Sequence, residues 1–208
     1  MIATAWSRYN GLTVPCEPFE LGWHAYAASA AYDWEPRDPD RAALDRQFAA
    51  CFLGAPDSPA MPAVDWLDRG KQLGHAHLLA AARSAFEAAE SASTPHGRRY
   101  LAHLALAAQL AQTTWPIERG LHAAWAQAAR AEAGLLTRSQ KQRALEACDA
   151  GLRGLADWRE AARRVLAMGL NAADVQEAIE TQCYGYERRL RALREELASA
   201  RVFEGDAV

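Results

Sequence analysis

The chain has 208 residues and a mass of 22.8 kDa, with 50% hydrophobic and 24% charged residues, which predicts one or two folded domains and excludes a disordered polar chain. Its 23 basic and 26 acidic residues give a net charge of −3, which argues against nucleic acid as a partner. No apolar run approaches the roughly 20 residues that span a bilayer, and no secretory signal is visible, so we expect a cytoplasmic protein that does not bind membranes.

The first 18 residues are predicted to form one short strand followed by a loop. Residues 2–6 (IATAW) are an apolar run that ends on Trp6. Asn10, Gly11, Pro15 and Pro18 are turn-forming residues, and they predict a loop directly after the strand.

Two helices are predicted next. Residues 19–34 are rich in alanine, and their aromatic residues share one helical face: Phe19, Trp23, Tyr26 and Trp34. A second helix is expected to begin at Asp38-Pro39, with the aspartate as its cap and the proline at its first position. Its apolar stripe consists of Leu44, Phe48 and Phe52.

The segment around residues 55–62 is predicted to be a linker. Together with Gly54 it contains Pro56, Pro59 and Pro62, which is too many breaking residues for a regular element. We therefore divide the chain into a strand-loop-helix region at 1–54, a linker at 55–62 and an α-helical region at 63–203.

Beyond the linker the sequence predicts long helices. One is expected over residues 63–91, weakened by Gly70 and Gly74, and another begins at Thr94-Pro95. Trp115-Pro116 is expected to interrupt this helix, because a proline inside a helix removes a hydrogen bond and clashes with the preceding turn. A third helix is expected from there to Gly134.

The last part of the chain predicts an antiparallel helical hairpin. Thr137 and Gln140 fit a capping box, in which the threonine hydroxyl and the glutamine side chain satisfy free backbone amides reciprocally. The two helices that follow carry apolar stripes and are separated by a turn at residues 168–171. Each stripe must be buried, so the helices are expected to pack together. The predicted fold class is therefore mainly α, a helical bundle with a long C-terminal hairpin after one short strand.

The titratable residues do not form a recognisable catalytic or metal-binding motif. His75 and His77 are two residues apart, and on a helix this spacing separates their side chains by about 200°, which argues against a shared ion. Neither a nucleophile elbow, nor a phosphate loop, nor an HExxH motif is present. We expect no catalytic residue, no metal site and no cofactor. The four cysteines are widely spaced, and we expect reduced, mostly buried thiols.

Trp6 is the most informative of the seven tryptophans. Trp66, Trp115, Trp125 and Trp158 lie among apolar residues of predicted helices, where packing is expected. Trp6 instead stands where a strand becomes a loop. In a parallel barrel, the carboxyl ends of the strands form the substrate site.

Residues 1–53 resemble the last strand, loop and helix of the barrel in glycoside hydrolase family 20, the β-N-acetylhexosaminidases. The resemblance rests on the run ATAWSR at residues 3–8 and on the alanine-rich helix that ends at Trp34. It implies that Trp6 lines the sugar pocket. The family usually has a glutamate that binds sugar hydroxyls where this chain has Arg8. It usually has an acid–arginine pair where this chain has Ala31 and Tyr32.

This resemblance implies a C-terminal fragment of such an enzyme. The family uses an adjacent Asp-Glu pair and the acetamido group of the substrate, and no Asp-Glu pair occurs here. We expect the chain to be inactive alone, to contribute Trp6 and Arg8 to binding of a terminal N-acetylhexosamine, and to add a helical appendage. The unpaired edges of a lone strand predict self-association.

Two other interpretations remain open. A freestanding helical interaction or scaffold module would have the bundle as its whole function. A small independent helical enzyme is disfavoured, because the sequence lacks a convergent set of acid, base and nucleophile.

Overall fold

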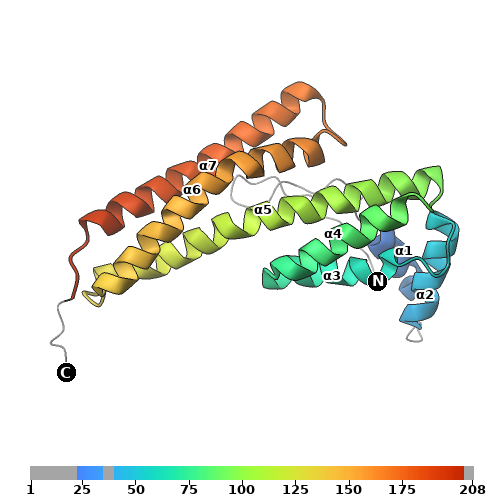
Figure 1. Ribbon diagram of the computed structural model, residues 1–208, viewed down its shortest axis with the longest axis horizontal. Coiled ribbons are helices and arrows are strands. Elements are labelled where there is room, and N and C mark those ends of the chain that lie inside the picture. Colours follow the sequence, from blue (N-terminus) through green and yellow to red (C-terminus); the bar gives the residue numbers. More distant parts are fainter. Residues whose placement is uncertain (1–22, 35–39, 204–208) are drawn as a thin grey trace. The chain divides into compact units, whose positions relative to one another are not determined.

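A computed structural model describes residues 23–34 and 40–203, which are mainly helical (Figure 1). The predicted strand at residues 2–6 and the loop after it lie outside these residues, and no described residue belongs to a strand. The elements are α1 (Trp23–Trp34), α2 (Arg41–Phe48), the π-helical turn η2 (Ala49–Leu53), α3 (Ala60–Leu73), α4 (Ala76–Glu90), α5 (Pro95–Glu132), α6 (Arg138–Leu166) and α7 (Ala172–Ser199).

The chain forms two compact units. The N-terminal unit comprises Met1–Gln112 and Arg164–Asn171, and the C-terminal unit comprises Thr113–Arg163 and Ala172–Val208. Helix α5 contributes its first part to the N-terminal unit and the remainder to the C-terminal unit.

Helix α2 begins later than its sequence predicts. Its cap is Asp40, whose Oδ1 accepts a hydrogen bond of 2.9 Å from the backbone N–H of Ala42. The predicted start at Asp38 and Pro39 is therefore two residues too early. Asp40 lies two residues after the predicted cap Asp38 and offers the same side-chain acceptor. The sequence spacing alone does not show which of the two aspartates caps the helix.

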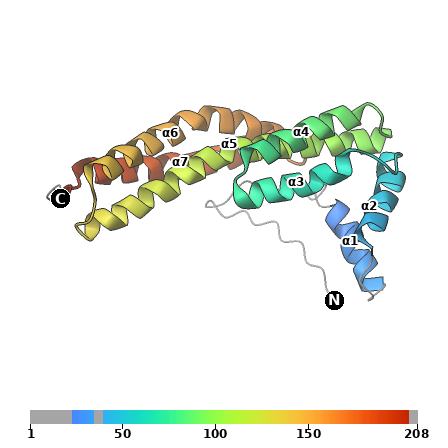
Figure 2. The same ribbon diagram turned by 60° about the horizontal axis from the view of Figure 1, so that its bottom comes forward.

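The single helix predicted over residues 63–91 is wrong, because α3 and α4 are separate helices that lie side by side (Figure 2). Gly74 ends α3 in the left-handed conformation, with φ of 63°, which favours glycine. The chain turns there and packs Leu79 of α4 against Gly70, where a Cβ would lie 2.8 Å from Leu79 Cγ. Helix α3 also begins at Ala60, inside the predicted linker.

The interruption predicted at Trp115-Pro116 is also wrong, because α5 continues through Pro116. The proline ring is exposed, whereas Thr114 and Ile117 beside it are buried. Burial of these neighbours offsets the hydrogen bond that a proline removes from a helix interior.

In the C-terminal unit, α5, α6 and α7 pack closely because glycines allow their backbones to approach. A Cβ on Gly120 of α5 would lie 2.8 Å from the carbonyl oxygen of Ala147 of α6. A Cβ on Gly151 would lie 3.1 Å from the Leu190 side chain of α7. Trp158 is fully buried in this core and makes an edge-on ring contact with Tyr186 at 5.5 Å.

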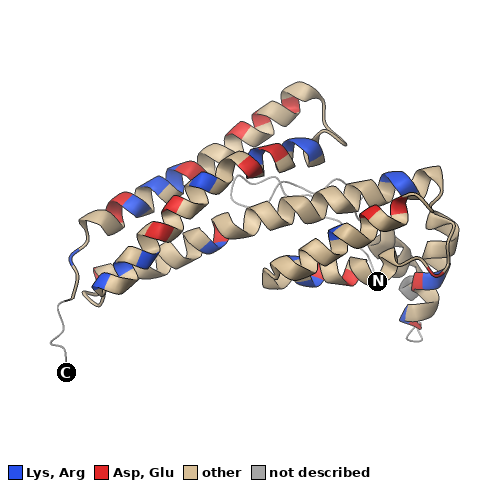
Figure 3. Ribbon diagram, viewed as in Figure 1, with Lys and Arg blue, Asp and Glu red and all other residues tan. Residues whose placement is uncertain are grey.

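Helices α6 and α7 are antiparallel, and polar contacts join them along their length. Arg194 Nε donates to Asp149 Oδ1 at 2.7 Å, and Lys141 Nζ donates to the carbonyl oxygens of Ala198 and Ala200 at 2.8 and 2.7 Å. The lysine thus caps the C-terminal end of α7, where free carbonyls favour a cation. Figure 3 shows acidic and basic residues interspersed along both helices.

The capping box at the start of α6 is confirmed. The N–H of Thr137 donates to Gln140 Oε1 at 3.0 Å, and the N–H of Gln140 donates to Thr137 Oγ1 at 3.4 Å. Among the described helices, none combines the length and the apolar character needed to cross a membrane.

The expectations for buried tryptophans and thiols hold only in part. Trp158 is buried as predicted, whereas Trp125 is 68% exposed, so packing is the wrong prediction for Trp125. Cys148 and Cys183 are buried free thiols, and Cys51 is free but exposed. A tryptophan among alanines carries no sequence signal that separates a core position from a surface position.

Candidate functional site

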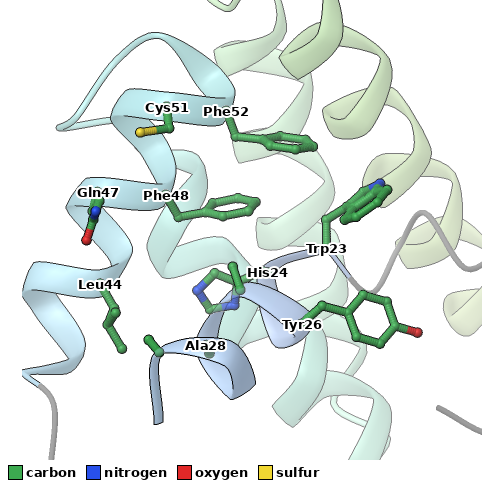
Figure 4. A pocket seen from close by; sticks show the side chains of 11 residues that line it. Trp23, His24, Tyr26, Ala28, Leu44, Gln47, Phe48, Cys51 and Phe52 are labelled. Carbon is green, nitrogen blue, oxygen red and sulfur yellow. The ribbon is translucent and has the colours of Figure 1, made fainter. Parts of the chain in front are cut away.

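The strongest candidate site lies in the N-terminal unit, between α1 and the continuous segment α2–η2. The apolar stripe predicted for this segment is confirmed: Phe48 and Phe52 are one turn apart and stack with ring centroids at 4.9 Å. Trp23 of α1 approaches Phe52 at 6.2 Å. Figure 4 shows both phenylalanine rings pointing from their helix toward Trp23.

The turn η2 is held in place from the far side by the start of α5. Thr94 Oγ1 donates to the carbonyl oxygen of Phe52 at 2.9 Å. The backbone N–H of Thr94 donates to the carbonyl oxygen of Leu53 at 3.0 Å. Gly54 ends the turn with φ of 77°. The wider π-helical turn leaves carbonyls without a regular helical partner, and Thr94 satisfies two of them.

Tyr100 of α5 forms the base of this aromatic cluster. Its ring lies 5.9 Å from Phe48 and 5.3 Å from Phe52, in edge-on geometry, and it is 4% exposed. Burial raises the pKa of Tyr100 to about 12, because the phenolate would lose its solvation. The hydroxyl therefore stays neutral at physiological pH, and Tyr100 acts as a rigid, uncharged support for the two phenylalanines.

An open pocket of about 550 Å³ lies above these rings. Its volume falls in the range of small-molecule pockets. The lining is almost entirely apolar and consists of Trp23, His24, Tyr26, Ala27, Ala28, Ala31, Leu44, Gln47, Phe48, Cys51 and Phe52. Trp23 remains 37% exposed at its edge. A hollow of this kind suits an apolar or aromatic occupant.

His24 of the pocket lining pairs with Asp45 of α2, which is not itself a lining residue. His24 Nε2 lies 2.8 Å from Asp45 Oδ1, and the imidazole packs edge-on against Phe48 at 5.2 Å. Arg41 Nε lies 3.4 Å from the other carboxylate oxygen of Asp45. The carboxylate is thus fixed by a cation and in turn orients the imidazole, as in many sites where a carboxylate positions a histidine.

Among the described residues, no nucleophile is placed within reach of this pair. Cys51 is the nucleophilic side chain of the pocket, and Figure 4 shows its sulfur pointing away from His24. Nucleophilic catalysis requires the base within hydrogen-bond reach of the nucleophile. The geometry of the described residues therefore supports binding or packing at this pocket.

The residues predicted from the sequence to bind sugar, Trp6 and Arg8, lie outside the described residues. Of the residues that form the pocket, the sequence singled out Trp23, Tyr26, Leu44, Phe48 and Phe52 only as helix stripes. The sequence assigns no role to His24 and does not predict its pairing with Asp45. These two residues are 21 positions apart, and no local spacing signals such a contact.

No family model, curated protein or solved structure matches this chain.

Proposed function

We propose that this chain is the non-catalytic C-terminal part of a glycoside hydrolase of the family 20 type. In this proposal residues 2–6 form the last strand of the barrel, Trp6 forms one wall of the sugar pocket, and Arg8 donates hydrogen bonds to sugar hydroxyls. The helices that follow are an appendage to the barrel. The ligand is a terminal N-acetylhexosamine, bound in the complete enzyme, which works in the cytoplasm without a cofactor.

One observation supports this proposal beyond the sequence resemblance: α1 is apolar on more sides than the described residues cover. His24 and Ala28 face α2–η2 across the pocket, whereas Ala25 and Ala30 are exposed along the same helix. An apolar helix face that the described residues leave exposed suits contact with another part of a larger assembly. A barrel helix is covered by its strands on one side and, where an appendage follows, by that appendage on another. In isolation, the open face of α1 favours self-association, because it exposes apolar surface that another copy could cover.

The proposal is tested by Trp6→Ala in the enzyme encoded by the complete reading frame. Loss of a stacking wall weakens binding in the ground state and the transition state, so kcat/KM for a chromogenic N-acetyl-β-glucosaminide is expected to fall by about tenfold or more. The melting temperature is expected to change little. Arg8→Ala is expected to lower kcat/KM as well, and Trp125→Ala, at an exposed position, to leave both quantities unchanged.

Two outcomes contradict the assignment of Trp6. If Trp6→Ala leaves kcat/KM unchanged, the side chain does not contact the sugar. If the variant unfolds the enzyme, Trp6 is a core residue, for which truncation typically costs about 3 to 5 kcal/mol.

A second candidate is a freestanding helical interaction module. The observation in its favour comes from the C-terminal unit, which has its own close-packed core and still exposes large aromatic side chains, among them Trp125 and Tyr184. Trp125 is 68% exposed and Tyr184 is 64% exposed, with Arg188 placed 5.7 Å over the Tyr184 ring. Exposed tryptophan, tyrosine and arginine are enriched at protein interfaces.

A further inference from the structure

The pocket between α1 and α2–η2 has walls that are tied to one another and to α3. His24 Nε2 of α1 lies 2.8 Å from Asp45 Oδ1 of α2. Arg41 of α2 donates from Nη2 to Asp65 Oδ1 of α3 at 2.6 Å. Both contacts hold α2 in place beside the hollow. A site that is already formed loses less conformational freedom when a ligand enters, which favours binding.

The aromatic rings of the pocket are packed against one another. Phe48 and Phe52 stack, and Tyr100 of α5 meets both of them edge-on. Trp23 meets Tyr26 edge-on at 6.3 Å and approaches Phe52 at 6.2 Å (Figure 4). Offset and edge-on ring pairs attract each other beyond the burial of their area. A flat aromatic ligand can extend this set of contacts, whereas an aliphatic chain gains only the burial of its surface.

The charge of the lining excludes other classes of ligand. None of the described residues that line the pocket is Lys, Arg, Asp or Glu, and the imidazole of His24 already pairs with Asp45. A charged group buried here would lose its hydration without gaining a partner, and so would most hydroxyls of a sugar. The pocket is therefore unsuited to the sugar that the proposed function assigns to Trp6 and Arg8.

We propose that this pocket binds an uncharged aromatic small molecule with two or three rings. The volume of about 550 Å³ lies within the range of small-molecule sites, which is about 300 to 1,000 Å³. Trp23 is 37% exposed, so the aromatic lining is accessible from solvent. This inference rests on the described pocket alone and does not depend on the proposed function.

The experiment is a fluorescence titration of the full chain with N-phenyl-1-naphthylamine, an uncharged aromatic probe that becomes brighter in apolar surroundings. The expected result is one saturable site per chain. The matched ligand is 8-anilinonaphthalene-1-sulfonate, which has the same rings and one negative charge. It is expected to bind about tenfold more weakly or worse, because its charge finds no partner in the lining. Decanol and N-acetylglucosamine, at the concentration of the probe, are expected not to displace it.

Two variants fill the pocket from opposite walls. Ala28→Trp places an indole in the hollow from α1, and Leu44→Trp does so from α2, because both residues line the pocket. Each is expected to weaken binding of the uncharged probe by about tenfold or more through steric exclusion. The matched control is Ala30→Trp, at an exposed position of α1 outside the lining. It is expected to leave the affinity unchanged, with equal helix content by circular dichroism.

The proposal is overturned if the fluorescence does not saturate, or if Ala28→Trp and Leu44→Trp both fold and bind the probe as tightly as Ala30→Trp. Equal or tighter binding of the sulfonate overturns the uncharged class, and displacement by decanol overturns the aromatic class. A probe affinity that rises as the chain is diluted, with dimers in analytical ultracentrifugation, overturns it as well, because a second copy of the chain then occupies the pocket.

Discussion

Replacing Trp158 with alanine is expected to lower the free energy of unfolding by about 3 to 5 kcal/mol, the usual cost of truncating a fully buried tryptophan. Trp158 has 0% exposure and is among the largest fully buried side chains of the described residues. Its removal leaves a cavity within the C-terminal unit and abolishes the edge-on contact with Tyr186 at 5.5 Å. Urea unfolding followed by circular dichroism measures the change.

The matched control is Trp125→Ala in the same unit. Trp125 is 68% exposed, so its truncation is expected to change the free energy of unfolding by no more than about 0.5 kcal/mol. The two substitutions remove the same atoms and differ only in burial. Equal effects of the two variants would show that the packing of α6 described above is wrong.

Gly120→Ala is expected to destabilise the protein, although alanine is the better helix former. A Cβ at this position would lie 2.8 Å from the carbonyl oxygen of Ala147, a backbone atom that moves only if α6 moves. Overpacking of this kind typically costs about 1 to 3 kcal/mol, which at all but the low end exceeds the gain of about 1 kcal/mol in helix propensity.

Gly154→Ala is the control with the opposite sign. A Cβ there would meet Ile117 Cγ1 at 3.7 Å, an ordinary van der Waals distance. The variant is expected to gain roughly 0.5 to 1 kcal/mol from helix propensity. Thermal unfolding of both variants decides the matter: a Gly120→Ala protein as stable as the Gly154→Ala protein would contradict the close approach of α5 and α6.

The features that sequence predicts correctly are those that depend on neighbours along the chain. The capping box of Thr137 and Gln140 needs only residues three apart, and the hydrogen bonds at 3.0 and 3.4 Å confirm it. The stripe of Phe48 and Phe52 likewise needs only helical spacing, and the two rings do stack. Local geometry decides both features, so local sequence carries the signal.

Errors arise where packing decides between local alternatives. Pro116 is a helix breaker by its own chemistry, yet α5 continues through it because Thr114 and Ile117 are buried beside it. Gly74 is a tolerable helix residue in the sequence, yet it ends α3 because the chain turns back to pack Leu79 against Gly70. Tertiary contacts override propensity in each case, and they are not visible in a single sequence.

In the candidate pocket, too, the sequence predicts the local features and misses the contacts between helices. Its aromatic residues could be found from helix stripes, but their convergence could not. Trp23 of α1 contacts Phe52 of η2. His24 contacts Asp45, which lies 21 positions later in the chain. Side-chain pairs at such separations depend on how helices dock, which the hydrophobic period of each helix does not specify.

The central claim is that the chain belongs to a larger sugar-cleaving enzyme, and immunoprecipitation tests it most directly. Antibodies against residues 138–199, which form α6 and α7, are used on extracts of cells that produce the protein. We expect a polypeptide heavier than 22.8 kDa. Its precipitate is expected to hydrolyse a chromogenic N-acetyl-β-glucosaminide, whereas the purified 208-residue chain is expected to be inactive. A single polypeptide of 22.8 kDa with no associated hydrolysis would contradict the proposal and favour a helical interaction module.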